Sequence, residues 1–545
     1  MSGRGTEERH GLTGGEWVVR SLAREGVRHV FGIPGIHNLP IYDALLRQSE
    51  ITHVLARHEQ GAAFMADGYA RASGTPGVVV VTSGPAATNT LTPLAESYSG
   101  SVPVFVIMSD IASSLVGRDL GALHEVPNQI DCFRPVTRWA EALRDTSAIP
   151  ASLATAFDLT RTGRPGPIAL SIPNDLLFAR AEATTPPVGT SRRPPCHVRD
   201  VDAAARRLGA ATRPLIVTGG GVVVAGAERE LADLARRLGA PVITTVSGRG
   251  AVDERDPLWH SVLPDRRATA AALQAADVVL AVGTKLGHRS LEKLGVTLGA
   301  GQTLIHLDLD PSVIGRAFKA EIAVVGDARD GLARLLESLG TGAPARGWDR
   351  AWLASLRSDA GPRFTPDVAA TIAALRQTLP DDAIVVNDQT GLTYWMEHRF
   401  PVYAPRTFLY PTGSAVLGYA VPAAIGAKLA RPERAVVAVA GDGGFMFSVA
   451  ELATAVKYRL PIVFVVVNDD RYGAIKYLQT RLYDGRWGET ELANPDFPAL
   501  AHAFGASGER VETAAALSGA ISRGLLANGP TVLELRMTIE PPWEM

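Results

Sequence analysis

Short apolar runs alternate with segments of helical periodicity along the chain. In the first third, the apolar runs lie at 29–33, 52–56, 77–82 and 103–108. The helical patterns between them lie at 39–48, 59–73 and 86–98. Strands that are buried on both faces read as continuous apolar runs, and strands that alternate with helices form parallel sheets covered on both faces. This part of the chain therefore predicts a doubly wound α/β domain.

The same alternation occurs twice more. A second block has a strand that runs into a glycine turn, a helix and three further strands, at 213–223, 226–238, 241–246, 276–286 and 303–310. A third block has strands at 383–388, 435–443 and 461–469 and helices at 418–430 and 448–459. Polar segments rich in Pro, Gly or Arg separate the blocks, at 184–195 and 339–365. We predict an α/β protein of three doubly wound parallel-sheet domains, with boundaries 11–185, 198–340 and 366–545.

Composition narrows the class of protein. The 545 residues exceed the size of one core, and 46% of them are hydrophobic. The formal net charge of −2 gives no electrostatic reason for a nucleic-acid partner. No apolar run reaches the roughly 18 residues of a membrane span, and the first ten residues lack the apolar core of a secretory signal. Cys132 and Cys196 form neither a metal motif nor a disulfide framework, which is typical of a reducing compartment. We therefore expect a cytoplasmic protein with no nucleic-acid or membrane partner.

Three consecutive glycines, Gly219–Gly221, follow the first predicted strand of the second block. A strand that ends in glycines is a weak signal for dinucleotide binding, because any tight turn from strand to helix selects glycine. Both interpretations stay open at this point.

Acidic residues follow two successive predicted strands of the third block. The sequence Gly441-Asp442-Gly443-Gly444 follows one strand, and Asn468-Asp469-Asp470 follows the next. Asp442 and Asp469 are 27 positions apart, the length of one α/β crossover, so we expect both at the carboxyl ends of adjacent parallel strands. Carboxylate oxygens suit Mg²⁺, and glycines at a helix N-terminus let backbone N–H groups approach a phosphate. The spacing predicts a magnesium and phosphate site, whereas the GDG turn alone is typical of many strand-to-helix turns.

This pattern resembles the signature of thiamine diphosphate-dependent enzymes, in which GDG is followed by an Asn-Asn, Asn-Asp or Asn-Gly pair. The resemblance extends over almost the whole chain and implies thiamine diphosphate and Mg²⁺ as cofactors. It implies Asp442, Asp469 and the main-chain carbonyl of Arg471 as metal ligands. Asp469 stands where Asn is commoner, which adds a negative charge and should still allow coordination. The three predicted domains would be the pyrimidine-binding, central Rossmann-like and diphosphate-binding domains of that family.

The segment 411–426 resembles the part of the family that bends the cofactor. By this resemblance Leu417 lies under the cofactor, and the carbonyl of Ala415 accepts a hydrogen bond from its pyrimidine amino group. An ordinary core leucine is the alternative for Leu417. The other residues that the resemblance assigns to cofactor binding are Asp388, Gly413, Gly441, Gly443, Gly444, Tyr472 and Gly473.

The segment 56–74 resembles the helix that carries the catalytic glutamate of the family, which would be Glu59. A glutamate in the first turn is also a common capping choice. The resemblance implies that Glu59 hydrogen-bonds the pyrimidine ring, binds the cofactor and relays the proton that activates it. In the family this carboxyl comes from one subunit and the metal site from another. We therefore expect a homodimer or homotetramer with its active site at the subunit interface. Whether a small regulatory subunit binds is not decided by the sequence.

Four places bear on the choice of reaction. In 31–38, His37 aligns with a histidine of benzaldehyde lyase, and Ile36 precedes it. In 121–129, His124 stands where many relatives have a glutamine. Both histidines are candidate catalytic proton donors, because the ordinary pKa of histidine is near 6.5. We place Ile36, His37, His124, Ala474 and Leu478 in the substrate pocket.

The third and fourth places, and one run in the middle block, depart from relatives. The loop 82–89, TSGPAATN, resembles the acetolactate synthase loop and lacks the histidines of the decarboxylases. Leu478 stands where acetolactate synthase has a tryptophan, which leaves room for a larger acceptor. The run Lys285–Arg289 replaces a sequence that helps acetolactate synthases with FAD and substrate. Arg289 could bind a substrate carboxylate or lie on the surface, and the sequence leaves FAD open.

These features predict a carboligase or lyase that acts on 2-oxo acids, aldehydes or acyloins. The first hypothesis is an acetolactate synthase-like carboligase. The alternatives are an acyloin lyase or carboligase of the benzaldehyde lyase kind, and a non-oxidative 2-oxo acid decarboxylase. A catalytically silent member used for binding or regulation is disfavoured, because Glu59, Asp442 and Asp469 are all present.

Overall fold

The computed structural model describes residues 11–189, 193–263, 266–287, 298–299, 301–341, 347–358 and 365–543. The chain divides into two compact units. The first runs to Arg192 and includes Ile425–Ala430, and the second comprises Arg193–Ala424 and the chain from Arg431 onward.

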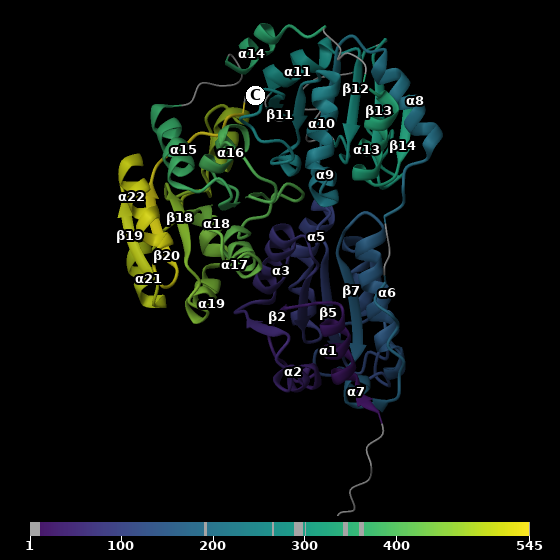
Figure 1. Ribbon diagram of the computed structural model, residues 1–545. Coiled ribbons are helices and arrows are strands. Elements are labelled where there is room, and N and C mark those ends of the chain that lie inside the picture. Colours follow the sequence, from purple (N-terminus) through teal and green to yellow (C-terminus); the bar gives the residue numbers. More distant parts are fainter. Residues whose placement is uncertain are drawn as a thin grey trace, which may run out of the picture. The chain divides into compact units, whose positions relative to one another are not determined.

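The first unit contains one six-stranded sheet in the order β3-β2-β4-β5-β7-β6, in which every pair of neighbours is parallel. Figure 1 labels β2, β5 and β7 of this sheet. Its strands are β2 (His29–Gly32), β3 (Thr52–Leu55), β4 (Gly77–Val81), β5 (Val104–Asp110), β6 (Trp139–Ala142) and β7 (Ile168–Pro173). Its helices are α1 (Gly14–Arg24), α2 (Leu39–Leu46), α3 (Glu59–Ser73), α4 (Pro85–Thr88), α5 (Leu91–Gly100), α6 (Ile149–Thr162) and α7 (Asn174–Phe178). A short antiparallel pair, β1 (Leu12–Thr13) with β8 (Arg180–Ala181), completes it. The four strands that we predicted here are confirmed, and β6 and β7 were not predicted.

Burial on both faces of this sheet explains its continuous apolar strands. Alternate residues of β4, such as Val78 and Val80, belong to a core with Leu22 of α1 and Phe157 of α6. The intervening Val79 is equally buried, and α3 packs against β4 along with β2 and β5. A period-two pattern is absent because neither face meets water.

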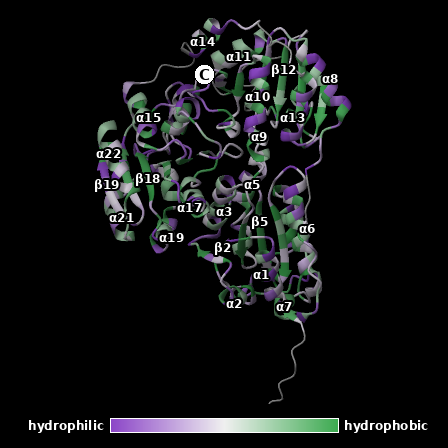
Figure 2. Cartoon of the chain, in the orientation of Figure 1, coloured by the Kyte–Doolittle hydropathy of each residue, from purple (hydrophilic) through white to green (hydrophobic). Residues whose placement is uncertain are grey.

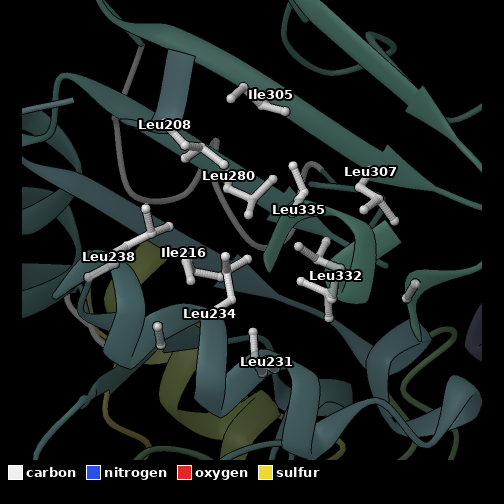
Figure 3. Packing of buried hydrophobic residues seen from close by; sticks show 14 of the residues in the cluster. Leu208, Ile216, Leu231, Leu234, Leu238, Leu280, Ile305, Leu307, Leu332 and Leu335 are labelled. Atoms are coloured by element: carbon white, nitrogen blue, oxygen red, sulfur yellow. The ribbon is translucent and has the colours of Figure 1, made fainter. Parts of the chain in front are cut away.

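The first sheet of the second unit has the order β11-β10-β9-β12-β13-β14, again all parallel. Its strands are β9 (Pro214–Thr218), β10 (Val242–Thr244), β11 (Trp259–Val262), β12 (Val278–Val282), β13 (Thr303–Asp308) and β14 (Ile322–Val325). Its helices are α8 (Val198–Gly209), α9 (Gly220–Ala225), α10 (Glu228–Leu238), α11 (Arg266–Ala275), α13 (Ala328–Leu339) and α14 (Arg350–Ser358). In chain order the strands read 3-2-1-4-5-6, the arrangement of dinucleotide-binding folds, which confirms the Rossmann-like prediction. Leucines of α8, α10 and α13 pack on β9, β12 and β13 (Figure 3).

The glycine turn after β9 is explained by contacts between backbones. The N–H of Gly219 donates to the carbonyl of Val282 at 2.9 Å, and that of Gly221 donates to the carbonyl of Gly283 at 3.0 Å. A Cβ atom at Gly221 would lie 2.6 Å from the Cα of Gly283. Two of the three glycine N–H groups are therefore used within the protein, which favours the tight-turn interpretation. His288 and Arg289, which bear on the flavin and carboxylate hypotheses, lie outside the described residues.

The second sheet of this unit has the order β16-β15-β17-β18-β20-β19 and is also parallel throughout. Its strands are β15 (Ile384–Asn387), β16 (Phe408–Leu409), β17 (Val436–Gly441), β18 (Ile462–Asn468), β19 (Ser507–Val511) and β20 (Thr531–Arg536). The helices of this part of the chain are α15 (Pro366–Thr378), α16 (Gly391–Arg399), α17 (Ala420–Ala430), α18 (Asp442–Phe447), α19 (Leu452–Lys457), α20 (Gly473–Leu482), α21 (Phe497–Phe504) and α22 (Ala514–Leu525). The residues Ile425–Ala430 of α17 belong to the first unit. The pairing of β17 with β18 confirms that Asp442 and Asp469 follow adjacent parallel strands.

Hydropathy follows this layering. Strands such as β5, β12 and β18 are coloured as hydrophobic in Figure 2, whereas helices such as α8 also carry hydrophilic residues. Among the described residues, no helix has both the length and the apolar character that crossing a bilayer requires. The α/β fold with three parallel sheets is confirmed, and the sheets fall in order within the three predicted ranges. The domain boundaries themselves stay a prediction.

Candidate active site

Glu59 is the first residue of α3 and follows the loop after β3. The N-cap of this helix is His58, whose Nδ1 accepts the N–H of Gln60 at 3.1 Å. Glu59 is half-buried, and its Oε2 accepts a hydrogen bond of 2.9 Å from Nδ2 of Asn89. His58 supplies the N-cap hydrogen bond, Glu59 is an acidic residue of the first turn, and Asn89 orients its carboxylate. Asn89 lies in the quoted TSGPAATN loop, although the sequence alone gave it no role.

His37 and His124 lie side by side in the first unit. Their ring centroids are 5.3 Å apart and the rings are nearly perpendicular, at 89°. Nδ1 of His37 is 2.6 Å from Oγ of Ser83. Burial, followed by the charge of His124, lowers the pKa of His37, which favours its neutral form near pH 7. Nδ1 of His124 is buried and has no hydrogen-bond partner among the described residues.

A buried glutamine and a glycine hold this histidine pair together. Gln129 accepts the N–H of Gly84 through Oε1 at 2.7 Å and donates through Nε2 to the carbonyl of Ser109 at 3.0 Å. Gly84 has φ +64°, and a Cβ atom there would lie 2.5 Å from the carbonyl oxygen of His124. His124 itself has φ +65°. Sequence reasoning missed Ser83 and Gln129, whose only signal was their position inside the two quoted loops. Ile36 is 58% exposed beside His37.

The two acidic residues predicted to bind metal lie in the second unit. Asp442 is buried at the start of α18, where its Oδ1 accepts the N–H of Gly443 at 2.9 Å. Its Oδ2 accepts a hydrogen bond of 2.7 Å from Nδ2 of Asn494, which the sequence did not single out. Nε of Arg471 is 3.2 Å from Oδ2 of Asp469.

Burial and mutual repulsion disfavour the charged forms of this acidic pair. Burial, and next the charge of Asp442, raise the pKa of Asp469 to about 6. Burial also raises the pKa of Asp442. A divalent cation would relieve this like-charge cost, and oxygen ligands are what Mg²⁺ prefers. Among the described residues there is no cluster of three acidic, His or Cys side chains suited to a metal. The residues fit Mg²⁺ as two carboxylates and one carbonyl, that of Arg471.

The predicted glycines allow close packing around the acidic pair. A Cβ atom at Gly443 would lie 2.6 Å from the ring of Tyr472, and one at Gly473 would lie 2.9 Å from Oδ2 of Asp469. A Cβ atom at Gly444 would lie 2.8 Å from Oδ1 of Asp388, and one at Gly441 would lie 3.0 Å from Oγ1 of Thr390. Only glycine fits at the first three positions without a shift of the neighbouring atoms.

Asp388 is fully buried, and its carboxylate is occupied by the backbone. Its Oδ1 accepts the N–H of Gln389 and its Oδ2 accepts the N–H of Ala420, each at 2.9 Å. Burial raises its pKa in spite of these donors. Asp388 therefore anchors the segment 411–420, which carries the predicted cofactor residues. Its direct contact with a cofactor stays a prediction.

Residues 412–417 of that segment are not fully buried, whereas Pro411, Tyr419 and Ala420 are. Leu417 is only half-buried, and Gly413 and Ala415 are exposed. Ala415 also has φ +53°, a left-handed conformation that is unusual for alanine. A half-buried leucine next to a strained backbone is not an ordinary core residue, which supports the functional interpretation of Leu417.

Ala474 and Leu478 lie on α20, four residues apart and so on one face of the helix. Both are half-buried, and α20 has no fully buried residue. They share the second unit with Asp442 and Asp469, whereas Ile36, His37, Glu59 and His124 belong to the first unit.

Comparison with known proteins identifies the family of the chain. Family models of the thiamine pyrophosphate enzymes match in order: the N-terminal TPP binding domain at 12–132, the central domain at 201–335 and the C-terminal TPP binding domain at 388–535. The chain is 38% identical to a probable 2-ketoarginine decarboxylase of Pseudomonas aeruginosa, over 96% of this chain and 94% of that protein. It is 35% identical to the acetolactate synthase isozyme 3 large subunit of Escherichia coli, over 94% of this chain and 92% of that protein. It is 33% identical to a probable acetolactate synthase large subunit of Methanocaldococcus jannaschii, over 96% and 92%. The chain therefore belongs to the family of thiamine pyrophosphate-dependent enzymes, of the acetolactate synthase and 2-oxo acid decarboxylase type.

Proposed function

We propose that this enzyme is a thiamine diphosphate- and Mg²⁺-dependent carboligase, which joins a decarboxylated 2-oxo acid to a second carbonyl compound. The acidic pair Asp442 and Asp469 carries the cofactor part of the proposal, because the two carboxylates follow adjacent parallel strands and are buried, where a bound cation would offset their mutual repulsion. The carboligase part is supported by the loop 82–89 and by the acetolactate synthase relatives.

The side chains of the second unit would bind the cofactor. Asp442, Asp469 and the carbonyl of Arg471 would hold Mg²⁺, and through it the diphosphate. Leu417 would support the rings, and the carbonyl of Ala415 would accept from the pyrimidine amino group. When bound, thiamine diphosphate supplies an electron sink for the carbanion next to the substrate carbonyl. The protein contributes position and the exclusion of competing reactions.

Glu59 would hold a proton at its carboxyl group and exchange it with the pyrimidine ring. The hydrogen bond from Asn89 to Oε2 orients the carboxylate for this role. His37 and His124 would move protons at the substrate, since a neutral His37 can accept one and its neighbour lies 5.3 Å away between ring centroids. Ile36, Ala474 and Leu478 would line the substrate pocket.

We further propose a cytoplasmic homodimer or homotetramer, in which Glu59 of one subunit serves the metal site of its partner. The arrangement is natural for an isologous interface, because both subunits then contribute to two equal sites. Both cysteines are free thiols, in keeping with a reducing compartment. Several relatives are named large subunits, so a small regulatory subunit is an additional partner to test by co-purification.

A second candidate function is a non-oxidative 2-oxo acid decarboxylase. It is favoured by the relative named for 2-ketoarginine and by the His37–His124 pair, since a decarboxylase must deliver a proton to carbon. An acyloin lyase of the benzaldehyde lyase kind shares the His37 argument.

Incubation with pyruvate, thiamine diphosphate and Mg²⁺ separates these functions. We expect acetolactate, and acetaldehyde or no turnover would contradict the carboligase proposal. Carbon dioxide release from 2-ketoarginine without a coupled product would then support the decarboxylase, and cleavage of benzoin would support the lyase. A visible flavin absorption band in the purified protein would decide the FAD question independently of turnover.

A further inference from the structure

Asn494 lies at the centre of the acidic end of the second sheet of the second unit. Its Nδ2 is 2.7 Å from Oδ2 of Asp442, 3.2 Å from Oδ1 of Asn468 and 3.2 Å from Oδ1 of Asp470. These three acceptors come from the ends of β17 and β18. One amide group therefore links both segments that carry the proposed metal ligands.

The orientation of the Asn494 amide is fixed by its neighbours. Asn468 donates through Nδ2 to Oε1 of Glu534 at 2.8 Å and accepts the N–H of Asp470 at 3.1 Å, so its oxygen must face Asn494. Asp442 and Asp470 present carboxylate oxygens, which only accept when ionised. Asn494 must therefore turn its NH₂ group, and not its oxygen, toward all three.

The hydrogen bonds of Asp442 leave little freedom to its carboxylate. An ionised carboxylate offers about four lone-pair positions. Asp442 accepts from the N–H of Gly443 and the NH₂ of Asn494, and the backbone of Arg471 is a further donor to it. These donors therefore fix the orientation of the Asp442 carboxylate, and with it the lone pair that remains for a cation, before any cation binds.

Asn494 ends a short segment that pairs with the loop carrying Asp469 and Arg471. The carbonyl of Asp470 accepts the N–H of Leu492 at 2.8 Å, and the N–H of Tyr472 donates to the carbonyl of Thr490 at 2.8 Å. Arg471 and Glu491 form an antiparallel bridge. The segment 490–494 thus lies along 470–472 with Asn494 at its end.

We propose that Asn494 is a positioning residue of the metal site, which orients Asp442 and joins the two ligand-bearing loops. The inference rests on the proposed assignment of Asp442 and Asp469 as ligands. Groups that orient metal ligands typically change metal affinity about 10- to 100-fold when they are removed.

The test is a titration with Mg²⁺ at fixed thiamine diphosphate, in which cofactor binding is followed by calorimetry and no turnover is measured. Asn494→Leu keeps the size of the side chain and removes the donor. We expect it to need about 10-fold more Mg²⁺ or more. Asn528→Ala, at an exposed asparagine of the same unit, is the matched control and should bind as the unaltered protein does.

The outcomes separate this inference from the proposed function. A folded Asn494→Leu protein with unaltered Mg²⁺ dependence would overturn the positioning role. If that variant does not fold, Asn494→Ser serves instead, because one hydroxyl cannot serve three acceptors. It should still bind Mg²⁺ several-fold more weakly, and unaltered binding would again overturn the inference. Failure of the unaltered protein to bind thiamine diphosphate with Mg²⁺ would refute the cofactor proposal itself.

Discussion

The role that we assign to a side chain depends on its hydrogen bonds with neighbouring groups and on its burial. Glu59 begins α3, whose N-cap hydrogen bond comes from His58, and Asn89 donates to one oxygen of its carboxylate. Asp388, in contrast, is surrounded by backbone donors and holds a loop in place. Leu417 is separated from ordinary core leucines by its half-exposed position.

We expect Glu59→Gln to lower turnover by about 100- to 10,000-fold, the usual range for loss of a positioned proton-transfer group. The amide can still form a hydrogen bond, so thiamine diphosphate should bind nearly as in the unaltered protein. Steady-state kinetics together with calorimetric binding of the cofactor test this. Asn528→Ala, at an exposed asparagine, is the control variant and should keep the turnover of the unaltered protein. Unchanged turnover in Glu59→Gln would refute the catalytic role.

The two cysteines should differ in reactivity. Burial, and next the charge of Asp330, raise the pKa of Cys196 to about 12, and the thiolate is the reactive form. Cys132 is half-exposed. A thiol reagent at pH 8 should therefore label one site in the native protein and two after unfolding. Rapid labelling of Cys196 in the native state, detected by peptide mass, would contradict the burial described for it.

At the scale of elements, the tight turns at the carboxyl ends of the strands decide which loops can approach one another. Gly84 lets the loop after β4 lie against the backbone of His124. Gly219, Gly221 and Gly283 do the same between β9 and β12. The close approach at Gly84 forms part of the candidate active site. The close approach at Gly221 and Gly283 packs the turn after β9 against the turn after β12.

Gly84→Ala should be damaging to both stability and activity. Its φ of +64° and ψ of −116° suit glycine alone, and such strain costs about 1–3 kcal/mol. The added Cβ would also displace the His124 carbonyl, so the histidine pair should separate. Thermal unfolding measures the first effect, and histidine NMR resonances of His37 and His124 report the second. Gly117→Ala is the control, because Gly117 also has a positive φ but has nothing within 4 Å of an added Cβ. Equal effects of the two variants would show that strain alone, and not the contact with His124, is responsible.

At the scale of the whole molecule, the second unit joins its two sheets through a buried arginine. Arg249 forms two 2.8 Å hydrogen bonds with Glu254, and the side chains are 1% and 4% exposed. It also donates to the carbonyls of Met396, at 3.0 Å, and Phe400, at the end of α16. The ion pair is therefore almost completely buried. Through Arg249 it connects the segment after β10 with the end of α16.

We expect Arg249→Leu to lower the free energy of unfolding by about 3 kcal/mol or more, because it leaves Glu254 charged and without its partner in the interior. Arg236→Leu removes an exposed arginine that pairs with Asp233 and Asp256, and it should change stability little. Chemical denaturation of the two variants makes the comparison. Equal stability losses would show that burial does not set the value of the Arg249 pair.

The sequence alone determined the α/β class, the three sheets and the cofactor family. It did so because strands buried on both faces leave long apolar runs, and because one crossover's spacing between Asp442 and Asp469 is a local property of the chain. It missed β6, β16 and β19, which are short or only partly buried and so leave no such run. It also missed β7 and β20, although both are buried almost throughout.

Only the tertiary structure decided which distant side chains meet. His37 and His124 are 87 positions apart, and their contact depends on Gly84 and Gln129 holding two loops together. Asn89 reaches Glu59 from a neighbouring crossover, and Asn494 joins the ends of β17 and β18 from a third segment. Periodicity records what each segment buries against the sheet, whereas hydrogen bonds between loops depend on the backbone path that the packed sheets impose.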